Sequence, residues 1–138
     1  MTHDEHHRAV IDAFNAADWE RYRELVGDAI YVEPASGREV SGDELMQLAQ
    51  GWRQAFPDLT GTITSATENG DTLAHEITWV GTHAGPMVTP DGELPPTGNP
   101  LTVSAALVAT FEGERMVSFR HYFDMLGILQ ATGAIPQS

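Results

Sequence analysis

One histidine of this sequence, His121, stands in an otherwise apolar row of side chains near the end of the chain. A β-strand places alternate side chains on the same face. Within residues 116–123 these alternate positions are Val117, Phe119, His121 and Phe123. Burial among such neighbours disfavours the charged form of an imidazole, so the ring would stay neutral and able to accept a proton. His121 is therefore the first candidate for acid/base catalysis.

A carboxylate that precedes a proline, Glu33, is the second candidate. Residues 29–33 predict a strand that the following proline ends, because proline has no N–H to donate to a neighbouring strand. Tyr31 and Glu33 share one face of this strand, and Ile30 and Val32 share the other. The apolar pair needs a dry neighbour, and this by itself would turn the carboxylate outward. If the strand instead opens into a cavity, Glu33 would join the imidazole, so both orientations remain open.

A neutral imidazole and an enclosed carboxylate could remove a proton α to a carbonyl group and return it elsewhere. Hydrogen-bond donors in the same space would have to stabilise the enolate. Tyr31, His75 and Trp79 are candidates for this role. The last two lie on one side of a predicted strand at residues 72–83, in a row that is otherwise apolar.

Other chemistries fit the sequence less well. His75 and His83 are eight residues apart, which separates them by about 26 Å on one extended strand. At most one of them could meet His121 and Glu33 in a site of two histidines and one carboxylate, and we expect no metal. Asp58 lacks the spacing for a triad with histidine and serine. No phosphate-binding loop, dinucleotide fingerprint or nucleophile elbow is present, so we expect no cofactor.

Three amphipathic helices are predicted ahead of most of the strands. Residues 4–17 and 18–26 form the first two, and residues 41–56 form the longest, with Trp52 on its apolar face. We expect Trp52 to line the cavity. The histidines of the first residues, His3, His6 and His7, are predicted to lie in a solvated terminus.

The rest of the chain is predicted to be β-structure. Strands at 59–68 and 72–83 are joined by a turn at Asn69-Gly70-Asp71, and a long strand at 101–111 precedes the strand of His121. Residues 85–100 contain too many prolines and glycines for regular structure and predict a mobile loop at the cavity mouth. Asp124 should cap a short final helix. Ala105 is small where a packed sheet favours larger residues, which indicates a sheet that lines a cavity.

Four short motifs carry a resemblance to a known family. They are AFPDL at 55–59, GTHAG at 81–85, PPTGNP at 95–100 and YFD at 122–124, the last followed by apolar residues, a glutamine and a glycine. Together they resemble the SnoaL-like branch of the NTF2-like superfamily, which includes polyketide (ester) cyclases and is related to ketosteroid isomerases. The resemblance implies one α+β domain over residues 1–138. In this cystatin-like cone, a curved, mostly antiparallel sheet and N-terminal helices enclose a cavity.

The resemblance also bears on the site. Glu33 and its proline match the acid-proline pair of the ketosteroid isomerases, with Glu in place of Asp. His121 falls where the polyketide cyclases have an acid/base aspartate, and the polar residues that assist it there fall at Ala105 and Leu107, which perform no proton chemistry. The expected catalytic residues are therefore His121 and Glu33. The expected substrate-binding residues are Tyr31, Trp52, His75, Trp79, Phe119, Phe123, Ala105 and Leu107.

We therefore expect a cofactor-independent acid/base enzyme that acts on a hydrophobic carbonyl compound by proton transfer of the polyketide-cyclase or isomerase type. Two alternatives remain open. One is a domain that only binds a small molecule or another chain, and the other is epoxide hydrolysis or hydration in the same pocket. By analogy with the family, a homodimer is expected through the outer sheet face, where Thr78, Val80, Thr102 and Val108 alternate with inward residues.

The charge of the chain limits its partners. The formal net charge is -13, and all seven basic residues are arginine. Binding to nucleic acid or to an anionic membrane needs a basic face, so neither is expected. With no long apolar run and a polar N-terminus, the expectation is a soluble, cytoplasmic protein. The absence of lysine fits either the codon bias of a GC-rich genome or adaptation to salt.

Overall fold

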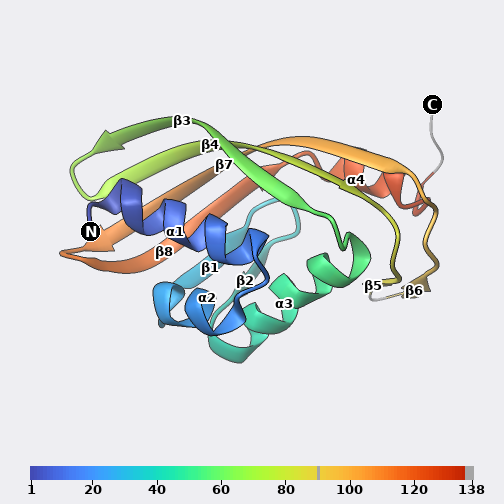
Figure 1. The fold of residues 1–138 in the computed structure, drawn as a ribbon, viewed down its shortest axis with the longest axis horizontal. Helices are drawn as coiled ribbons and strands as arrows, with labels where there is room; N and C mark the ends of the chain where they lie inside the picture. Colours follow the sequence, from blue (N-terminus) through green and yellow to red (C-terminus); the bar gives the residue numbers. More distant parts are fainter. Residues whose placement is uncertain (90, 136–138) are drawn as a thin grey trace.

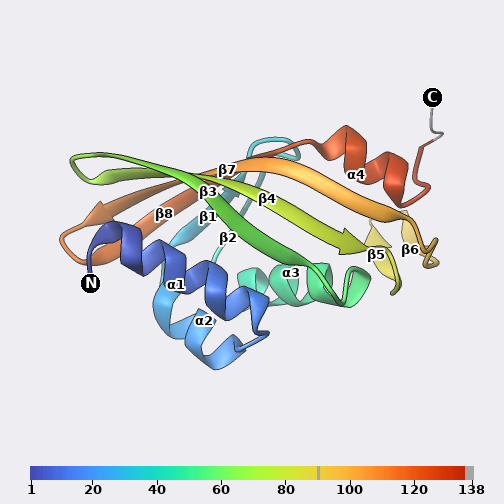
Figure 2. The same ribbon diagram turned by 45° about the horizontal axis from the view of Figure 1, so that its top comes forward.

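One curved sheet of six strands organises the structure, a computed structural model that describes residues 1–89 and 91–135. The helices of the N-terminal half of the chain lie against one face of this sheet (Figure 1, Figure 2). The strand order is β2 (Arg38–Val40), β1 (Ile30–Glu33), β8 (Arg115–Phe123), β7 (Pro100–Glu112), β4 (Thr72–Thr82) and β3 (Thr60–Asn69). Among these strands, only β1 and β8 pair in parallel. The expected α+β fold with a curved, mostly antiparallel sheet is confirmed.

Two helices come first in the chain, followed by two short strands, a third helix, the remaining strands and a final helix. The helices are α1 (His3–Asn15), α2 (Trp19–Val26), α3 (Gly42–Ala55) and α4 (Met125–Ala131). The strands of the main sheet are β1 (Ile30–Glu33), β2 (Arg38–Val40), β3 (Thr60–Asn69), β4 (Thr72–Thr82), β7 (Pro100–Glu112) and β8 (Arg115–Phe123). A separate two-stranded sheet contains β5 (Met87–Thr89) and β6 (Gly92–Leu94). Within the described residues, no helix has the length and hydropathy that crossing a membrane requires.

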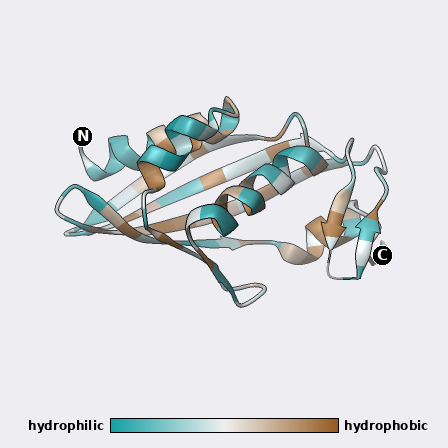
Figure 3. Ribbon diagram, turned by 90° about the horizontal axis from the view of Figure 1, so that it is seen from below, coloured by the Kyte–Doolittle hydropathy of each residue, from teal (hydrophilic) through white to brown (hydrophobic). Residues whose placement is uncertain are grey.

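Side-chain caps fix where the helices begin. At α1 the Thr2 hydroxyl accepts a hydrogen bond from the Glu5 N–H, and the Glu5 carboxylate accepts one from the Thr2 N–H, which is a capping box. Asp18 caps α2 and Asp124 caps α4, so Asp124 has the structural role that was predicted. The helices carry hydrophilic residues on the side seen in Figure 3, and hydrophobic segments of the sheet lie behind them.

Alternation along the long strands builds the inner face of the sheet. On β4 the buried residues are Leu73, His75, Ile77, Trp79 and Gly81, and their neighbours along the strand are more exposed. The same alternation holds on β7, where odd-numbered residues from Leu101 to Phe111 are buried. Because side chains of one parity point toward the helices, the sheet delivers one apolar face to the interior.

A bulge changes this alternation at the start of β8. The partner of Thr110 is Ser118, but the partner of Phe111 is Met116, so one residue of β8 is skipped in the pairing. Met116 is buried and Val117 is only partly buried. The prediction that Val117 shares the apolar row of His121 is therefore wrong, because a bulge shifts side-chain parity by one residue.

The short strand β1 faces the opposite way from what its apolar residues suggest. Tyr31 and Glu33 are buried, whereas Ile30 is exposed and Val32 is partly exposed. β1 lies parallel to β8 with Tyr31 beside Phe119, so the orientation of β8 decides which side of β1 faces the interior. Of the two orientations that the sequence left open, the structure has the one in which Glu33 is buried.

Two of the sequence motifs brace the end of α3. The Asp58 carboxylate accepts hydrogen bonds from the backbone N–H of Thr82 at 2.7 Å and from its hydroxyl at 3.0 Å. The Gly85 N–H donates to the carbonyl of Ala55 at 3.1 Å. A Cβ at Gly85 would collide with the carbonyl oxygen of Gln54, so this close approach requires glycine. AFPDL and GTHAG therefore hold the framework together.

The third motif, PPTGNP, ties this framework to the end of α4. His83 is buried, and its Nδ1 lies 3.0 Å from the Thr97 hydroxyl oxygen. The Thr97 hydroxyl and the Asn99 amide both donate to the carbonyl of Ala131. The segment predicted as an irregular loop also contains β5 and β6, which are three residues each and too short to show a periodic pattern.

Candidate active site

The concave face of the sheet and the helices enclose an apolar cavity. Its empty volume is about 760 Å³, counting the open solvent at its mouth. Almost every lining side chain is aliphatic or aromatic, with two histidines among them. The lining residues are His7, Val10, Ile11, Phe14, Tyr22, Tyr31, Leu45, Leu48, Trp52, Leu59, Trp79, Leu101, Val103, Leu107, Phe119, His121, Phe123 and Ile128.

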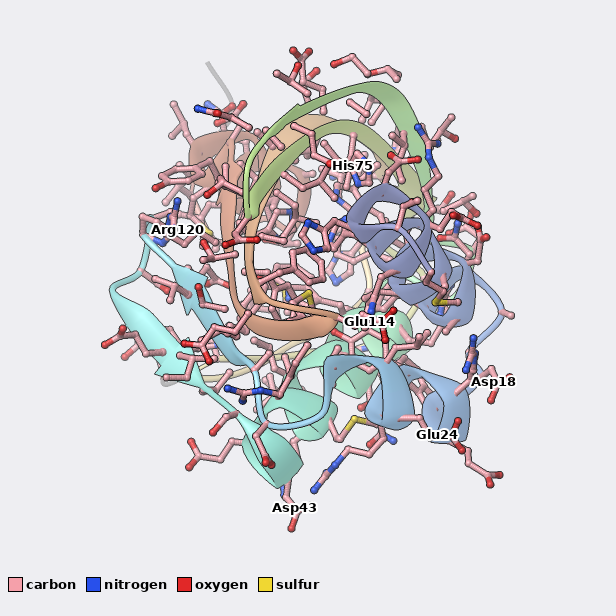
Figure 4. All side chains as sticks on the ribbon, turned by 90° about the vertical axis from the view of Figure 1, so that its left-hand side faces the viewer. Asp18, Glu24, Asp43, His75, Glu114 and Arg120 are labelled. Carbon is pink, nitrogen blue, oxygen red and sulfur yellow. The ribbon has the colours of Figure 1, made fainter. Side chains whose placement is uncertain are left out.

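His121 lies on the cavity wall, and both of its ring nitrogens are hydrogen-bonded. Nδ1 lies 2.8 Å from the Tyr31 hydroxyl oxygen, and the Trp79 indole N–H donates to Nε2 at 3.3 Å. The ring packs against Phe123 with centroids 4.7 Å apart. Side chains from β1, β4 and β8 thus meet at this imidazole, while Arg120, the residue before it, lies on the outer side of the sheet (Figure 4).

Glu33 takes part in the site through Tyr31 and does not line the cavity. The Tyr31 hydroxyl donates to Glu33 Oε2 at 3.2 Å, and the Ser36 hydroxyl donates to Oε1 at 2.8 Å. Glu33 is 1% exposed. The carboxylate is therefore a buried group behind the wall that reaches His121 only through the tyrosine hydroxyl.

These contacts fix the positions of the protons. The single hydroxyl proton of Tyr31 is donated to Glu33, so the tyrosine oxygen must accept a hydrogen bond from His121 Nδ1–H. In a neutral imidazole the other nitrogen is then an acceptor, and the indole N–H of Trp79 points at it. His121 is therefore held as the Nδ1–H tautomer with the lone pair of Nε2 directed into the site.

Burial sets the protonation states. Desolvation lowers the pKa of His121 from 6.5 to about 4, so the imidazole is neutral at neutral pH. Burial, followed by the negative charge of Glu33, raises the pKa of Tyr31 well above its ordinary value, so this hydroxyl keeps its proton. The site at rest is a neutral base, a neutral bridging hydroxyl and a carboxylate behind them.

The place of the Trp79 indole depends on a glycine on the neighbouring strand. Gly61 pairs with Trp79 across β3 and β4, and a Cβ at Gly61 would lie 2.6 Å from the indole ring. The side-chain amide of Asn15 donates to the Gly61 carbonyl and accepts from its N–H, both at 2.9 Å. Asn15 therefore holds the backbone against which the indole lies. In this way it helps to keep the indole N–H in hydrogen-bonding position to His121.

The structure brings together most of the residues that the sequence singled out. Six of the predicted binding residues line the cavity, namely Tyr31, Trp52, Trp79, Leu107, Phe119 and Phe123. Ala105 is buried next to the cavity but is absent from its lining, and His75 lies behind it, on β4 beside α1 (Figure 4). The lining of the cavity thus gives no support to ligand contact by Ala105 or His75, which stays a prediction. His83 belongs to the framework described above, where it contacts Thr97, and it is not among the residues that line the cavity.

His7 is the cavity residue that the sequence analysis missed. The prediction that His3, His6 and His7 lie in a solvated terminus is wrong, because all three belong to α1. His7 is fully buried. The signal was available, since His7, Val10, Ile11 and Phe14 have the spacing i, i+3, i+4, i+7 of one helix face.

The described part of the chain contains no group of three or more histidine, aspartate or glutamate side chains placed to hold a metal ion.

Comparisons with known proteins agree with this architecture. The family model described as SnoaL-like polyketide cyclase matches residues 4–132. A search of functionally curated proteins gave no match. Among solved structures, AclR of Streptomyces galilaeus, a proposed hydroxylase, is 23% identical with a TM-score of 0.82, over 98% of this chain and 83% of that one.

Two further structures are similar over nearly the whole chain. IdmH of Streptomyces antibioticus, a proposed polyketide cyclase, is 25% identical with a TM-score of 0.79, over 96% of this chain and 99% of that one. A protein of ketosteroid isomerase-like fold from Catenulispora acidiphila, solved with trimethylamine, is 24% identical with a TM-score of 0.74, over 94% and 92% of the two chains.

Proposed function

Because this chain belongs to the SnoaL-like polyketide cyclase family, we propose that its cavity binds a small hydrophobic carbonyl compound and moves a proton on it without a cofactor. The single observation that carries the proposal is the hydrogen-bonded chain from Glu33 through Tyr31 to His121. These hydrogen bonds leave the Nε2 lone pair of His121 available in an apolar cavity. A positioned neutral base in a water-poor site is suited to abstract a proton next to a carbonyl group.

The proposed step begins when a ligand displaces the indole N–H of Trp79 from His121 Nε2. The C–H bond α to the carbonyl breaks, an N–H bond forms at Nε2, and the electron pair moves to the carbonyl oxygen to give an enolate. The released indole N–H donates to that oxygen. Return of the proton to another atom completes an isomerisation. In a cyclisation, the enolate carbon instead forms a C–C bond with a second carbonyl of the same molecule, and the proton on His121 Nε2 passes to the resulting alkoxide oxygen.

The buried carboxylate stabilises the charge that the step creates. When His121 takes up the proton, the imidazolium donates through Nδ1 to Tyr31, whose hydroxyl donates to Glu33. Glu33 is thus a positioning residue that acts through Tyr31. Its negative charge offsets part of the desolvation that disfavours the imidazolium.

The low pKa of His121 narrows the substrate class. Burial lowers this pKa to about 4, and a weak base removes a proton efficiently only from a fairly acidic carbon. A methylene group between two carbonyls meets this condition better than a simple ketone does. We therefore propose 1,3-dicarbonyl compounds with an aromatic or other apolar body as substrates, in agreement with the proposed cyclase activity of IdmH.

Proton exchange with D₂O tests this function without knowledge of the natural substrate. An aryl 1,3-diketone should lose its methylene proton signal faster with the protein than with buffer alone. A general base contributes about 10²–10⁴-fold to such a rate, so His121→Phe should remove most of the enhancement. Tyr22→Phe, which alters another lining residue, is the matched control. Binding of the diketone with no enhanced exchange would favour a domain that only binds its ligand.

The homodimer remains a further proposal. Val80 is 50% exposed on the outer sheet face, in the row where the resemblance places a partner chain. A single lysine there would desolvate a charge in such an interface. Val80→Lys should therefore convert a dimer to a monomer in analytical ultracentrifugation, and a monomeric parent protein would refute the proposal.

A further inference from the structure

A second pair of histidines connects the cavity wall to the surface. His7 on α1 and His75 on β4 face each other with their Nδ1 atoms 2.7 Å apart, and both side chains are fully buried. His75 Nε2 lies 2.7 Å from Asp4 Oδ1. The Asp4 side chain is partly exposed and also forms an ion pair with Arg8. The three residues thus form a chain of hydrogen bonds from solvent to the cavity.

The Asp4 carboxylate determines which ring nitrogens of His75 and His7 carry protons. Its hydrogen bond to His75, followed by that to Arg8, lowers the pKa of Asp4, so the carboxylate only accepts. His75 Nε2 must then carry a proton and donate. Where this is the only proton on the ring, Nδ1 of His75 is an acceptor. The facing Nδ1 of His7 therefore carries the proton. By elimination, Nε2 of a neutral His7 has a free lone pair.

That lone pair has no partner in the described part of the chain. His7 Nε2 is buried without a hydrogen bond, and His7 is one of the side chains that line the cavity. Leaving a buried polar atom unsatisfied is costly, so a ligand in this cavity gains affinity if it brings a donor to this atom. The neighbouring Phe119 ring, with its centroid 6.4 Å from that of His7, has no hydrogen-bond donor to offer.

Charge supports the neutral state of His7. Burial, together with the nearby His75, His121 and His6, lowers the pKa of His7 to about 3, against a smaller opposing effect of Asp4. The imidazole is therefore uncharged at neutral pH, and its unpartnered Nε2 is an acceptor, not a donor. A ligand that meets this atom has to bring its own proton.

We infer that His7 Nε2 is a binding subsite for a hydroxyl group of the ligand, phenolic or enolic, and that His75 and Asp4 hold it in the accepting tautomer. The inference rests on the proposed function for the use of this cavity as the ligand site. A ligand that satisfies both polar points has a carbonyl near His121 and a hydroxyl near His7, and an apolar body against the remaining walls. This defines hydroxylated aryl ketones and their enols, in contrast to ketones without a hydroxyl.

A matched pair of ligands tests the subsite by equilibrium binding. The probes are an acetylnaphthol, whose hydroxyl and acetyl groups lie on different rings, and the acetylnaphthalene that lacks the hydroxyl. At about pH 8.5, well above the ordinary histidine pKa, the acetylnaphthol should bind about tenfold more tightly, as expected for one hydrogen bond to a buried acceptor.

Variants on the same helix assign the effect to one atom. His7→Phe keeps an aromatic ring but removes the acceptor, so the affinity ratio should fall to about one while acetylnaphthalene binding stays within about twofold. His3→Phe is the matched control, because His3 also lies on α1 but stacks on Phe111 away from the cavity lining, and it should keep the ratio. His7→Gln, which retains a side-chain acceptor, serves if His7→Phe does not fold and should keep part of the ratio.

Equal binding of the two probes by the parent protein, a ratio that survives in His7→Phe, or binding of neither probe would overturn the inference. The readout needs no turnover. A hydroxyl preference in a protein that fails to exchange the diketone methylene would refute the proposed function and leave the subsite standing. Diketone exchange without a hydroxyl preference would do the reverse.

Discussion

Tyr31→Phe removes one oxygen atom and breaks two hydrogen bonds that connect the buried carboxylate to the cavity base. The lost contacts are the 2.8 Å bond to His121 and the 3.2 Å bond to Glu33. A hydrogen bond to a charged group contributes about 1.5–3 kcal/mol, and a buried donor without a partner costs about 1–3 kcal/mol. Ser36 still donates to the carboxylate. We therefore expect the free energy of unfolding to fall by about 3 kcal/mol.

Urea unfolding measures this loss, and Tyr22→Phe provides the control. Tyr22 is equally buried and also lines the cavity, but in the described part of the chain its hydroxyl makes no hydrogen bond. Tyr22→Phe should change the stability by no more than about 0.5 kcal/mol. In a double-mutant cycle, Tyr31→Phe and Glu33→Gln should couple by about 1–2 kcal/mol. Equal small losses in both tyrosine variants, or additive losses in the cycle, would refute the proposed chain.

Three more predictions follow from other contacts. Gly61→Ala places a methyl group within 2.6 Å of the Trp79 ring, so it should displace the indole and reduce diketone exchange, whereas Gly51→Ala, on exposed α3 backbone with open space, should leave it unchanged. Asp58→Ala loses two hydrogen bonds to Thr82 and should lower stability by about 1–2 kcal/mol in urea without changing ligand affinity. Because the pKa of His121 falls from 6.5 to about 4 on folding, the unfolded chain binds the proton first, so stability should decrease as the pH falls from about 6.5 to about 4, by at most about 3 kcal/mol from this group. His121→Phe should show a shallower decrease, and a profile identical to that of the parent would contradict the buried neutral imidazole.

The sequence was sufficient where periodicity is long and uninterrupted. The alternation on β4 placed His75 and Trp79 on the inner face, and the alternation near the end of the chain did the same for Phe119 and His121. Helix spacing and an aspartate cap defined α2 almost to the residue. These features depend on local geometry, which one chain segment determines by itself.

The errors arose where another segment decides the orientation. In β1, alternation allowed either face to be inward, and pairing with β8 selected Tyr31 and Glu33 over the apolar Ile30. The bulge that buries Met116 in place of Val117 depends on pairing with β7. The hydrogen bonds that join three strands at His121, like the contact between His7 and a strand far along the chain, have no local signal at all.

Measurement of the His121 tautomer tests most directly whether this ring is the base of the cavity. In ¹⁵N-labelled protein at neutral pH, two-bond ¹H–¹⁵N correlations should show Nδ1 protonated and Nε2 unprotonated, because Tyr31 accepts from the first and Trp79 donates to the second. Addition of an aryl 1,3-diketone should shift the Nε2 resonance. An imidazole protonated on Nε2, or on both nitrogens, would contradict the claim that this ring is the base of the cavity.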